Sequence, residues 1–323
     1  MGRRILSLLL CLLLLPLPAL AEETALTDEE ITRLLWEMYQ TENGDADYMV
    51  LPEEYELPAE GKSGIYHLLL LGIDSPTEKI AGRSDTMVLA CFNARTGRLK
   101  LISFLRDTYV AIPGHGHNKL NAAYSYGGAD LLIQTLGASF GVRVDGYVAV
   151  NYTLMAALVD AIGGIQLEVT AAERRKLNGI LEYYNYLRDA DRKEGLLAED
   201  GLQTLNGLQT MSYSRIRKLD SDFVRVQRQQ KVLLAIYQKL RSLDMLALSR
   251  VITAYIGQVD TNVTLAQGAS LAASVLAYDD LDIQTLRVPV DKAFNRTTLN
   301  ETYYVVPKLD ACREAIQAFL DGD

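Results

Sequence analysis

The sequence is poor in cysteine and lacks several common functional motifs. Its three cysteines among 323 residues are too few for a disulfide-stabilised scaffold. The pattern Gly-x-x-x-x-Gly-Lys-Ser/Thr is absent, which excludes a P-loop NTPase, and no cysteine has a convincing histidine partner. His115 and His117 lie two residues apart in a loop rich in glycine and proline. Without a cysteine nearby, this pair indicates solvated loop residues rather than a metal site.

The chain also lacks a broad positive charge. The formal net charge is −9, and the acidic excess lies in residues 22–60, where thirteen acidic residues accompany a single basic one, Arg33. Residues 61–323 are close to neutral, so they carry no domain-wide positive field for nucleic acid. No stretch after residue 21 reaches eighteen apolar residues, which argues against a membrane-spanning helix there. A content of 49% hydrophobic and 23% charged residues is typical of a globular protein.

Residues 1–21 have the features of an export signal. Two arginines open the segment, Ile5–Leu15 is apolar, and Ala19 and Ala21 are the small residues expected before a cleavage site. As a helix, residues 5–21 would be about 25 Å long, shorter than a hydrocarbon core of roughly 30 Å, and two prolines interrupt them. The sequence therefore predicts a signal peptide cleaved after Ala21, with a short retained membrane anchor as the alternative.

The rest of the chain divides into an N-terminal arm and one body. Residues 22–64 contain a predicted amphipathic helix, Thr27–Gln40, followed by an acidic linker with glycine and proline. In the body, residues 65–323, strands are predicted at 66–73, 86–93, 99–104, 147–150, 165–169 and 284–290, and helices at 128–140, 152–162, 206–216, 222–242, 265–278 and 309–320. This alternation predicts an α/β fold around a central sheet.

Two acidic residues lie at the ends of neighbouring predicted strands. Asp74 ends the first strand, and Asp85 opens the second. If these strands are antiparallel neighbours, both carboxylates meet at one edge of the sheet, where ligands of open α/β sheets gather. Mg²⁺ prefers one or two carboxylates together with phosphate oxygens. The pattern predicts a magnesium site at Asp74 and Asp85, although each acid alone is also typical of a turn or a cap.

Basic residues follow the third predicted strand and occupy a nearby segment. Arg106 and Asp107 come directly after that strand, so they belong to a strand end as well. Arg106 could bind a phosphate through two nitrogens, or it could form an internal ion pair with an aspartate. Lys119 and Asn121 could position the same anion.

The densest basic segment is residues 215–231, where six basic residues accompany two acids. Arg215 and Arg217 end one predicted helix, and Arg225, Arg228 and Gln229 lie close together on the next. Two guanidinium groups and an amide on one helix face suit a diphosphate. The alternative is an ordinary solvated basic face.

Seven segments resemble the motifs of one protein family. They are residues 72–75, 82–87, 103–108, 119–124, 205–209, 213–217 and 222–229, which read GIDS, GRSDTM, SFLRDT, KLNAAY, LNGLQ, YSRIR and DFVRVQRQ. In order and spacing, the region from about Tyr66 to about Val290 resembles the LytR-CpsA-Psr family. Its members also carry the name cell-envelope-related transcriptional attenuator.

The resemblance implies a three-layer α/β/α sandwich with a central mixed sheet, which holds a polyprenyl chain in an apolar channel. It implies an extracytoplasmic, Mg²⁺-dependent phosphotransferase of the cell envelope. Such an enzyme moves a glycopolymer, for example teichoic acid or capsule, from an undecaprenyl-pyrophosphate carrier onto peptidoglycan. The implied partners are the polyprenyl-pyrophosphate-linked glycan, peptidoglycan and, through the lipid, the membrane surface, with no nucleic acid. On this basis residues 65–323 are the catalytic domain.

Site residues follow from the motif positions together with the residue-based candidates. The predicted metal ligands are Asp74 and Asp85, and the predicted catalytic set is Asp74, Asp85, Arg106 and Asp107. The predicted pyrophosphate-binding residues are Arg83, Arg106, Lys119, Asn121, Arg215, Arg217, Arg225, Arg228 and Gln229. Asp222 matches a motif position without a clear role. One departure from the family is Pro76, which stands where an arginine usually follows the first Asp-Ser.

Two other functions use the same residues. A binding protein could hold the lipid-linked glycan without turning it over, and a hydrolase could release glycan from the same carrier. The sequence names neither the glycan, the acceptor hydroxyl nor a general base, although Asp107 could orient the attacking hydroxyl. A DNA-binding regulator is disfavoured because the chain carries an export signal and its body is neutral.

Overall fold

A six-stranded mixed sheet forms the centre of the computed structural model, which describes residues 26–44, 64–75, 80, 82–216 and 222–322. Its strands, in spatial order, are β10 (Asp282–Val288), β3 (Arg98–Phe104), β2 (Arg83–Asn93), β1 (Ile65–Asp74), β6 (Gly146–Asn151) and β9 (Asp260–Thr261). β2 pairs antiparallel with both β1 and β3, whereas β6 runs parallel to β1 and β10 parallel to β3. These pairings confirm the predicted α/β class and the mixed sheet.

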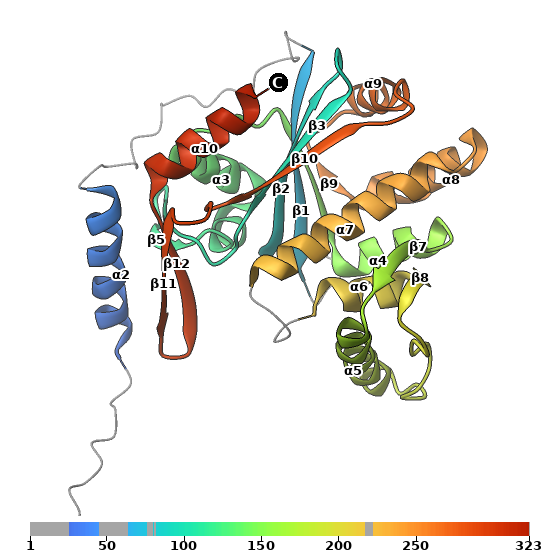
Figure 1. The fold of residues 1–323 in the computed structure, drawn as a ribbon, viewed down its shortest axis with the longest axis horizontal. Coiled ribbons are helices and arrows are strands. Elements are labelled where there is room, and N and C mark those ends of the chain that lie inside the picture. Colours follow the sequence, from blue (N-terminus) through green and yellow to red (C-terminus); the bar gives the residue numbers. More distant parts are fainter. Residues whose placement is uncertain (1–25, 45–63, 76–79, 81, 217–221, 323) are drawn as a thin grey trace, which may run out of the picture.

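Helices cover both faces of this sheet, which gives three layers (Figure 1). One face carries α2 (Asp28–Asn43), α3 (Ala122–Phe140) and α10 (Leu309–Asp321). The other side carries α4 (Tyr152–Ala161), α5 (Ala171–Leu187), α6 (Gly207–Ser214), α7 (Asp222–Arg241) and α8 (Met245–Tyr255), with α9 (Leu265–Leu276) near the edge of the sheet. No helix among the described residues is long and apolar enough to cross a bilayer.

Three two-stranded ribbons complete the fold. They are β4 (Tyr109–Ile112) with β5 (Gly116–Lys119), β7 (Ile165–Val169) with β8 (Gly201–Leu205), and β11 (Phe294–Leu299) with β12 (Thr302–Pro307). The sequence predicted only β7 among these strands and missed α5 and α8. β5, β8 and β11 are short and polar, so they carry little hydrophobic periodicity. α5 and α8 do have an apolar face, which the sequence reasoning overlooked.

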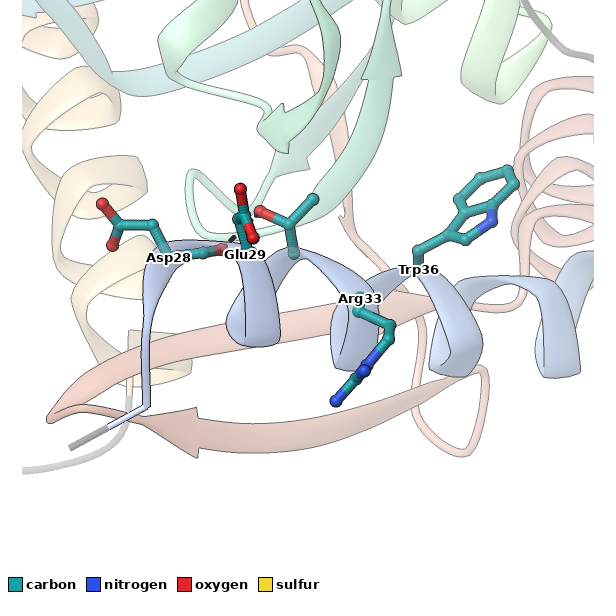
Figure 2. Close-up of a pocket in the computed structure, with 5 residues that line it drawn as sticks. Asp28, Glu29, Arg33 and Trp36 are labelled. Carbon is teal, nitrogen blue, oxygen red and sulfur yellow. Dashed lines mark hydrogen bonds between the residues drawn. The ribbon is translucent and has the colours of Figure 1, made fainter. Parts of the chain in front are cut away.

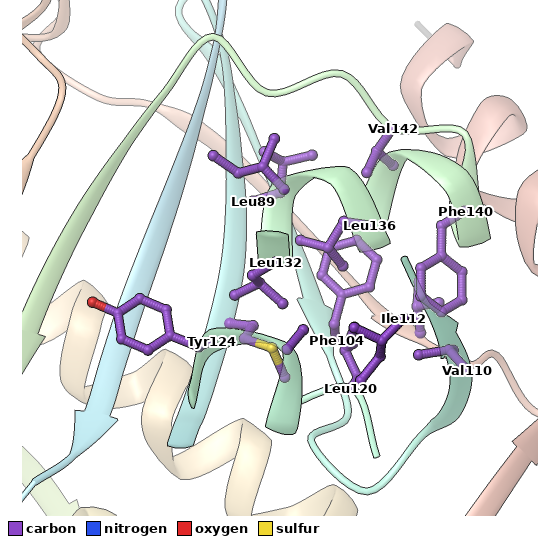
Figure 3. Packing of buried hydrophobic residues seen from close by; sticks show 14 of the residues in the cluster. Leu89, Phe104, Val110, Ile112, Leu120, Tyr124, Leu132, Leu136, Phe140 and Val142 are labelled. Atoms are coloured by element: carbon purple, nitrogen blue, oxygen red, sulfur yellow. The ribbon is translucent and has the colours of Figure 1, made fainter. Parts of the chain in front are cut away.

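The first layer is packed by apolar residues of α3 and the sheet. Leu132, Leu136 and Phe140 recur every four residues along α3 and are almost completely buried. Figure 3 shows them beside Phe104 of β3, whose ring centroid lies 5.2 Å from that of Phe140. The predicted helix at 128–140 is the second half of α3, because Gly128 has a φ of 66° and kinks the element.

The N-terminal helix α2 packs against this layer. Thr27 and Glu30 form the predicted capping box, and Ile31, Leu35 and Tyr39 are buried in the same core. The ring of Trp36 lies 4.5 Å from that of His117, so this histidine packs among aromatic rings and is not a solvated loop residue. Asp28, Glu29, Thr32, Arg33 and Trp36 line a pocket on the surface of the helix (Figure 2).

The second layer depends on a close approach between α4 and α6. Gly207, the first residue of α6, donates its backbone N–H to Asp160 at 2.7 Å. A Cβ atom at position 207 would lie 2.0 Å from the carbonyl oxygen of Ala156. Only glycine therefore fits at this contact, which holds α6 and the following arginine segment in place.

Gly207→Ala should lower the free energy of unfolding by about 1–3 kcal/mol, because α4 and α6 must separate to admit the methyl group. Gly179→Ala is the matched control, since nothing lies within 4 Å of that position on the exposed side of α5. The control should stabilise the protein by roughly 0.5–1 kcal/mol. Urea unfolding of both variants measures the difference, and equal effects would contradict the close contact.

Candidate functional site

The sheet brings Asp74 and Asp85 to one edge, as predicted. Asp74 is the last residue of β1, where it pairs with Arg83 of β2. Gly72 lies opposite Thr86 and Ile73 opposite Ser84, so Asp85 is the extra residue of a β-bulge. Bulges redirect a side chain at the end of a strand, and here the redirected carboxylate is buried (8% exposed).

Four charged side chains form a continuous ion-pair chain from Asp85. Arg106 directs Nη1 to both oxygens of Asp85, at 3.0 and 2.8 Å, and its Nε lies 3.2 Å from Oδ2 of Asp107. Lys119 Nζ lies 2.6 Å from the other oxygen of Asp107. Three separate elements thus contribute to one polar cluster: the start of β2, the residues after β3 and the end of β5.

Asp107 lies between two cations of this cluster. Burial alone would raise its pKa, but the charge of Arg106 and the hydrogen bond from Lys119 outweigh burial and hold the pKa below the ordinary value. Asp107 is therefore a carboxylate at neutral pH with two cationic partners.

A second group adjoins the first at the end of α6. Arg215 Nη2 lies 3.4 Å from Oδ1 of Asp74, and its guanidinium lies 4.8 Å from the ring centroid of Tyr152 and 5.9 Å from that of Tyr184. Burial raises the pKa of Tyr152 to about 12, and the carboxylate of Asp85 adds to the effect. Tyr152 is therefore a neutral hydroxyl group between the two acids and Arg215.

Arg225 and Arg83 complete the electropositive surroundings. Arg225 is buried (5% exposed), and its charge acts on both Asp107 and Tyr152. Arg83 is exposed, and its charge lowers the pKa of Tyr304, which burial and the charge of Asp28 raise overall. The ring of Tyr304 lies 4.9 Å from Lys119 Nζ. The structure thus gathers most of the predicted anion-binding residues around one region.

Other predicted residues occupy different positions. Arg228 is buried inside the second layer, where its Nε lies 3.0 Å from Glu173 and its Nη1 donates to the carbonyl of Ile216. Arg228 therefore pairs with a residue of α5, whereas Arg225, one turn earlier on α7, lies near the acids of the site. Asn121 is buried at the start of α3 and donates its backbone N–H to the carbonyl of Arg106.

Three further positions add little to the described site. Gln229 is half-buried, and it is the next residue, Gln230, that reaches the sheet by donating to Ser103 at 2.8 Å. Arg217 lies outside the described residues, and so does the side chain of Asp222.

The donor set suits a cation bound jointly with a substrate. Among the described residues no group of three or more acidic, histidine or cysteine side chains forms a protein cage for a metal. Asp74 and Asp85 supply two carboxylates, which is the number that Mg²⁺ takes from a protein when phosphate oxygens complete its coordination. The two acids therefore fit Mg²⁺ held with a phosphate ligand, and this assignment stays a prediction.

An apolar cavity of about 340 Å³ lies in the second layer, between the sheet and its helices. Its walls come from β6, α4, α7, α8, η1 (Ile256–Gln258), the residue before β9, and α9. Val150 and Leu154 line it and flank Tyr152 in sequence, so β6 and α4 contribute to both the cavity and the surroundings of Arg215. It resembles the apolar channel expected from the family motifs.

Sequence reasoning missed the aromatic residues of the site. Tyr152 and Tyr184 lie beside Arg215, and Tyr304 lies beside Lys119, but tyrosines outside any motif carry no signal of their own. Residues 137–141 match the pattern Gly-x-Ser-x-Gly of some hydrolases. Ser139 is buried at the end of α3 and not on a strand-to-helix turn, so it is not a nucleophile.

Comparison with known proteins places these residues in a family context. The sequence model of the LytR_cpsA_psr family matches residues 37–317. The polyisoprenyl-teichoic acid–peptidoglycan teichoic acid transferase TagT of Bacillus subtilis is 36% identical over 200 residues, 61% of this chain and 57% of the relative. The transferase TagU of Enterococcus faecalis is 37% identical over 184 residues, 55% of each chain. The matched regions thus span just over half of these curated relatives.

Solved structures of such proteins share the fold. The crystal structure of B. subtilis TagT aligns with a TM-score of 0.64 at 26% identity, covering 83% of this chain and 94% of TagT. TagT with bound octaprenyl pyrophosphate aligns with a TM-score of 0.59 at 26% identity, covering 84% of this chain and 94% of the other.

Asp107→Asn should destabilise the protein at neutral pH, because Arg106 and Lys119 then lose their shared carboxylate. Since the folded pKa lies below the unfolded value, the ionised acid stabilises the fold above about pH 4, and this contribution is lost as the pH falls through the folded pKa. The difference from wild type should therefore shrink in acid. Urea unfolding between about pH 7 and pH 3 tests this, with exposed Asp279→Asn as control. A difference independent of pH would contradict the assignment.

Proposed function

The chain belongs to the LytR_cpsA_psr family, and from this membership we propose that it transfers a glycopolymer from a polyprenyl diphosphate carrier to peptidoglycan at the cell envelope. The observation that carries the proposal is that α4 and α7 each supply residues both to the arginine cluster, through Tyr152 and Arg225, and to an apolar cavity, through Leu154 and Tyr237. A substrate with a charged diphosphate and a long apolar tail needs both surfaces at once. The relatives named above are teichoic acid transferases, which supports the same substrate class here.

The diphosphate would bind among the arginines. Arg215 and Arg225 approach from α6 and α7, and Arg106 and Lys119 approach from the strand ends. Guanidinium groups hold phosphate oxygens through pairs of hydrogen bonds, which distinguishes them from an ammonium group. The substrate would take over part of the interactions that Asp74 and Asp85 now make with these cations.

The polyprenyl tail would lie in the apolar cavity. α7 connects the two surfaces, since Arg225 lies near its start and Tyr237 and Leu240 line the cavity farther along. Arg225 and Tyr237 are twelve residues apart in sequence, which is about 18 Å along a helix axis. The bound octaprenyl pyrophosphate in TagT supports this arrangement.

The transfer step places the attacking hydroxyl of the acceptor opposite the lipid phosphate. A new bond forms between that oxygen and the glycan-linked phosphorus, and the bond to the bridging oxygen breaks. The lipid monophosphate leaves with the electron pair, and the hydroxyl proton passes to this leaving phosphate or to solvent. Arg106, Arg215 and Arg225 would stabilise the negative charge that shifts to the leaving oxygen. With its pKa lowered between two cations, Asp107 is suited to orient the acceptor hydroxyl and poorly suited to remove its proton.

Magnesium would be held by Asp74 and Asp85 together with the diphosphate. When bound, it supplies positive charge that weakens the repulsion between the substrate and an incoming oxygen. The protein holds the two acids at the sheet edge through the pairing of β1 with β2 and the bulge at Asp85.

A transferase needs the peptidoglycan acceptor, a hydrolase releases the glycan without it, and a binding protein leaves the substrate unchanged. Incubation of the chain with a radiolabelled lipid-linked glycan, with and without peptidoglycan, separates the three. Labelled peptidoglycan supports transfer, free glycan with or without acceptor identifies a hydrolase, and an unchanged substrate identifies a binder.

Arg225→Ala should weaken the binding of a short polyprenyl diphosphate roughly ten- to a hundredfold, because a charged hydrogen bond contributes about 1.5–3 kcal/mol. Arg225→Lys should retain part of the affinity, and the loss should be smaller for a polyprenyl monophosphate. Isothermal titration measures all three ligand–variant pairs. Exposed Arg175→Ala is the control, and a change below about threefold for Arg225→Ala would contradict its role in binding.

Asp74→Asn should weaken Mg²⁺ binding in the presence of the diphosphate by at least about tenfold, since one of two carboxylate ligands is lost. Its melting temperature should change little because the side chain is 38% exposed. Asp282→Asn is the matched control, an exposed acid that pairs with Arg98 at the far side of the sheet. Mn²⁺ titration followed by electron paramagnetic resonance gives the affinity, and equal values for both variants would remove Asp74 from the metal site.

A further inference from the structure

Helix α9 is unusually apolar for its exposure. None of its twelve residues is charged, and none of those with described side chains is buried. Leu265 at its start is 69% exposed, the highest value among the exposed large apolar side chains described. An apolar helix on the surface marks an interaction site when nothing within the chain covers it.

The same surface contains the open side of the apolar cavity. Ile252 and Ile256 line the cavity and yet are 42% and 50% exposed. Ala272 and Val275 of α9 line it from the other side, and Leu265 precedes Ala272 by seven residues, which places it on the same helical face. The exposed apolar side chains therefore surround the entrance to the cavity.

Arginines lie on this surface beside an acid, since the exposed Asp244 caps the start of α8. Arg250 is the single charged residue within α8 and α9, and it is exposed. Arg241 lines the cavity, with its guanidinium 5.8 Å from the ring centroid of Tyr237. Apolar side chains bordered by arginine and tyrosine are typical of surfaces that enter the boundary between lipid head groups and acyl chains.

We infer that α8, η1 and α9 form a docking surface for a lipid bilayer, with Ile252, Ile256 and Leu265 inserted among the lipids. This inference rests on the proposed function, because a polyprenyl tail must pass from the bilayer into the cavity. With the entrance at the membrane, the tail crosses no water. In Figure 1, α8 and α9 lie at the opposite side of the molecule from α2, so the surface pocket of α2 is distant from the lipid.

A fluorescent label on α9 tests the surface directly. The full chain with Cys11→Ser and Ala269→Cys is labelled with an environment-sensitive dye. Burial raises the pKa of Cys91 to about 12 and that of Cys312 to about 11, so these thiols do not compete. On addition of vesicles of phosphatidylglycerol and phosphatidylcholine, the label should shift to the blue. A label at Leu202→Cys, a 65% exposed position on β8, should not shift.

Charged substitutions give the matched comparison. Ile256→Glu combined with Leu265→Glu should weaken vesicle binding at least tenfold, as judged from the label at position 269. Leu187→Glu, at a side chain that is 58% exposed on α5, should leave vesicle binding unchanged. No shift at position 269, or equal shifts at 269 and 202, would overturn the inference. So would a shift that needs no vesicles and grows with protein concentration, because a second copy of the chain would then cover the surface.

The proposed function is tested separately with water-soluble geranyl diphosphate. If the Ile256→Glu, Leu265→Glu variant binds this ligand normally but wild type ignores vesicles, the docking surface is wrong and the proposed function stands. If the α9 label enters vesicles but wild type does not bind the diphosphate, the docking surface stands and the proposed function is wrong.

Discussion

Charges that are buried at the edge of the sheet need partners, and this need organises the site. Asp85 and Asp107 are both nearly buried, and an isolated carboxylate there would be too costly to ionise. Arg106 pairs with both acids and Lys119 with Asp107, so each buried acid has a cationic partner. The bulge in β2, the end of β3 and the end of β5 must all be in register for these contacts to form. The ion-pair chain therefore links the order of the sheet to the position of the functional groups.

Helix α7 divides its residues between two tasks. Arg225 and Arg228 are separated by a single turn, and both are buried, but they interact with different groups. Arg228 pairs with Glu173, which also accepts a hydrogen bond from Tyr213 of α6, so it joins α5, α6 and α7. Arg225 influences Asp107 and Tyr152 instead. The ion pair of Arg228 fixes the position of α7, and the fixed helix holds Arg225 in the site.

The proposed substrate has a charged diphosphate and an apolar tail, and two parts of the second layer match these two portions. The cluster around Arg215 offers charge and aromatic rings. The cavity enclosed by α4, α7, α8 and α9 has apolar walls apart from Arg241, Tyr237 and Tyr255. Tyr152 begins α4 where the two parts meet. The same division continues to the surface, where α9 carries no charge at all.

The sequence by itself determined the fold class, five of the six strands of the central sheet and the family, because apolar runs and ordered motifs are local properties. It placed Asp74 and Asp85 at one edge on the condition that their strands are antiparallel neighbours, and the tertiary structure supplied that pairing. Tertiary structure alone decided which arginine faces the site, because Arg225 and Arg228 have equivalent surroundings in sequence and differ only in what packs against each face of α7. It alone revealed Tyr152 and the apolar cavity, since both arise where elements distant in sequence meet. A local sequence pattern shows which residues can be buried, but only the packing of distant elements decides which partners those residues contact.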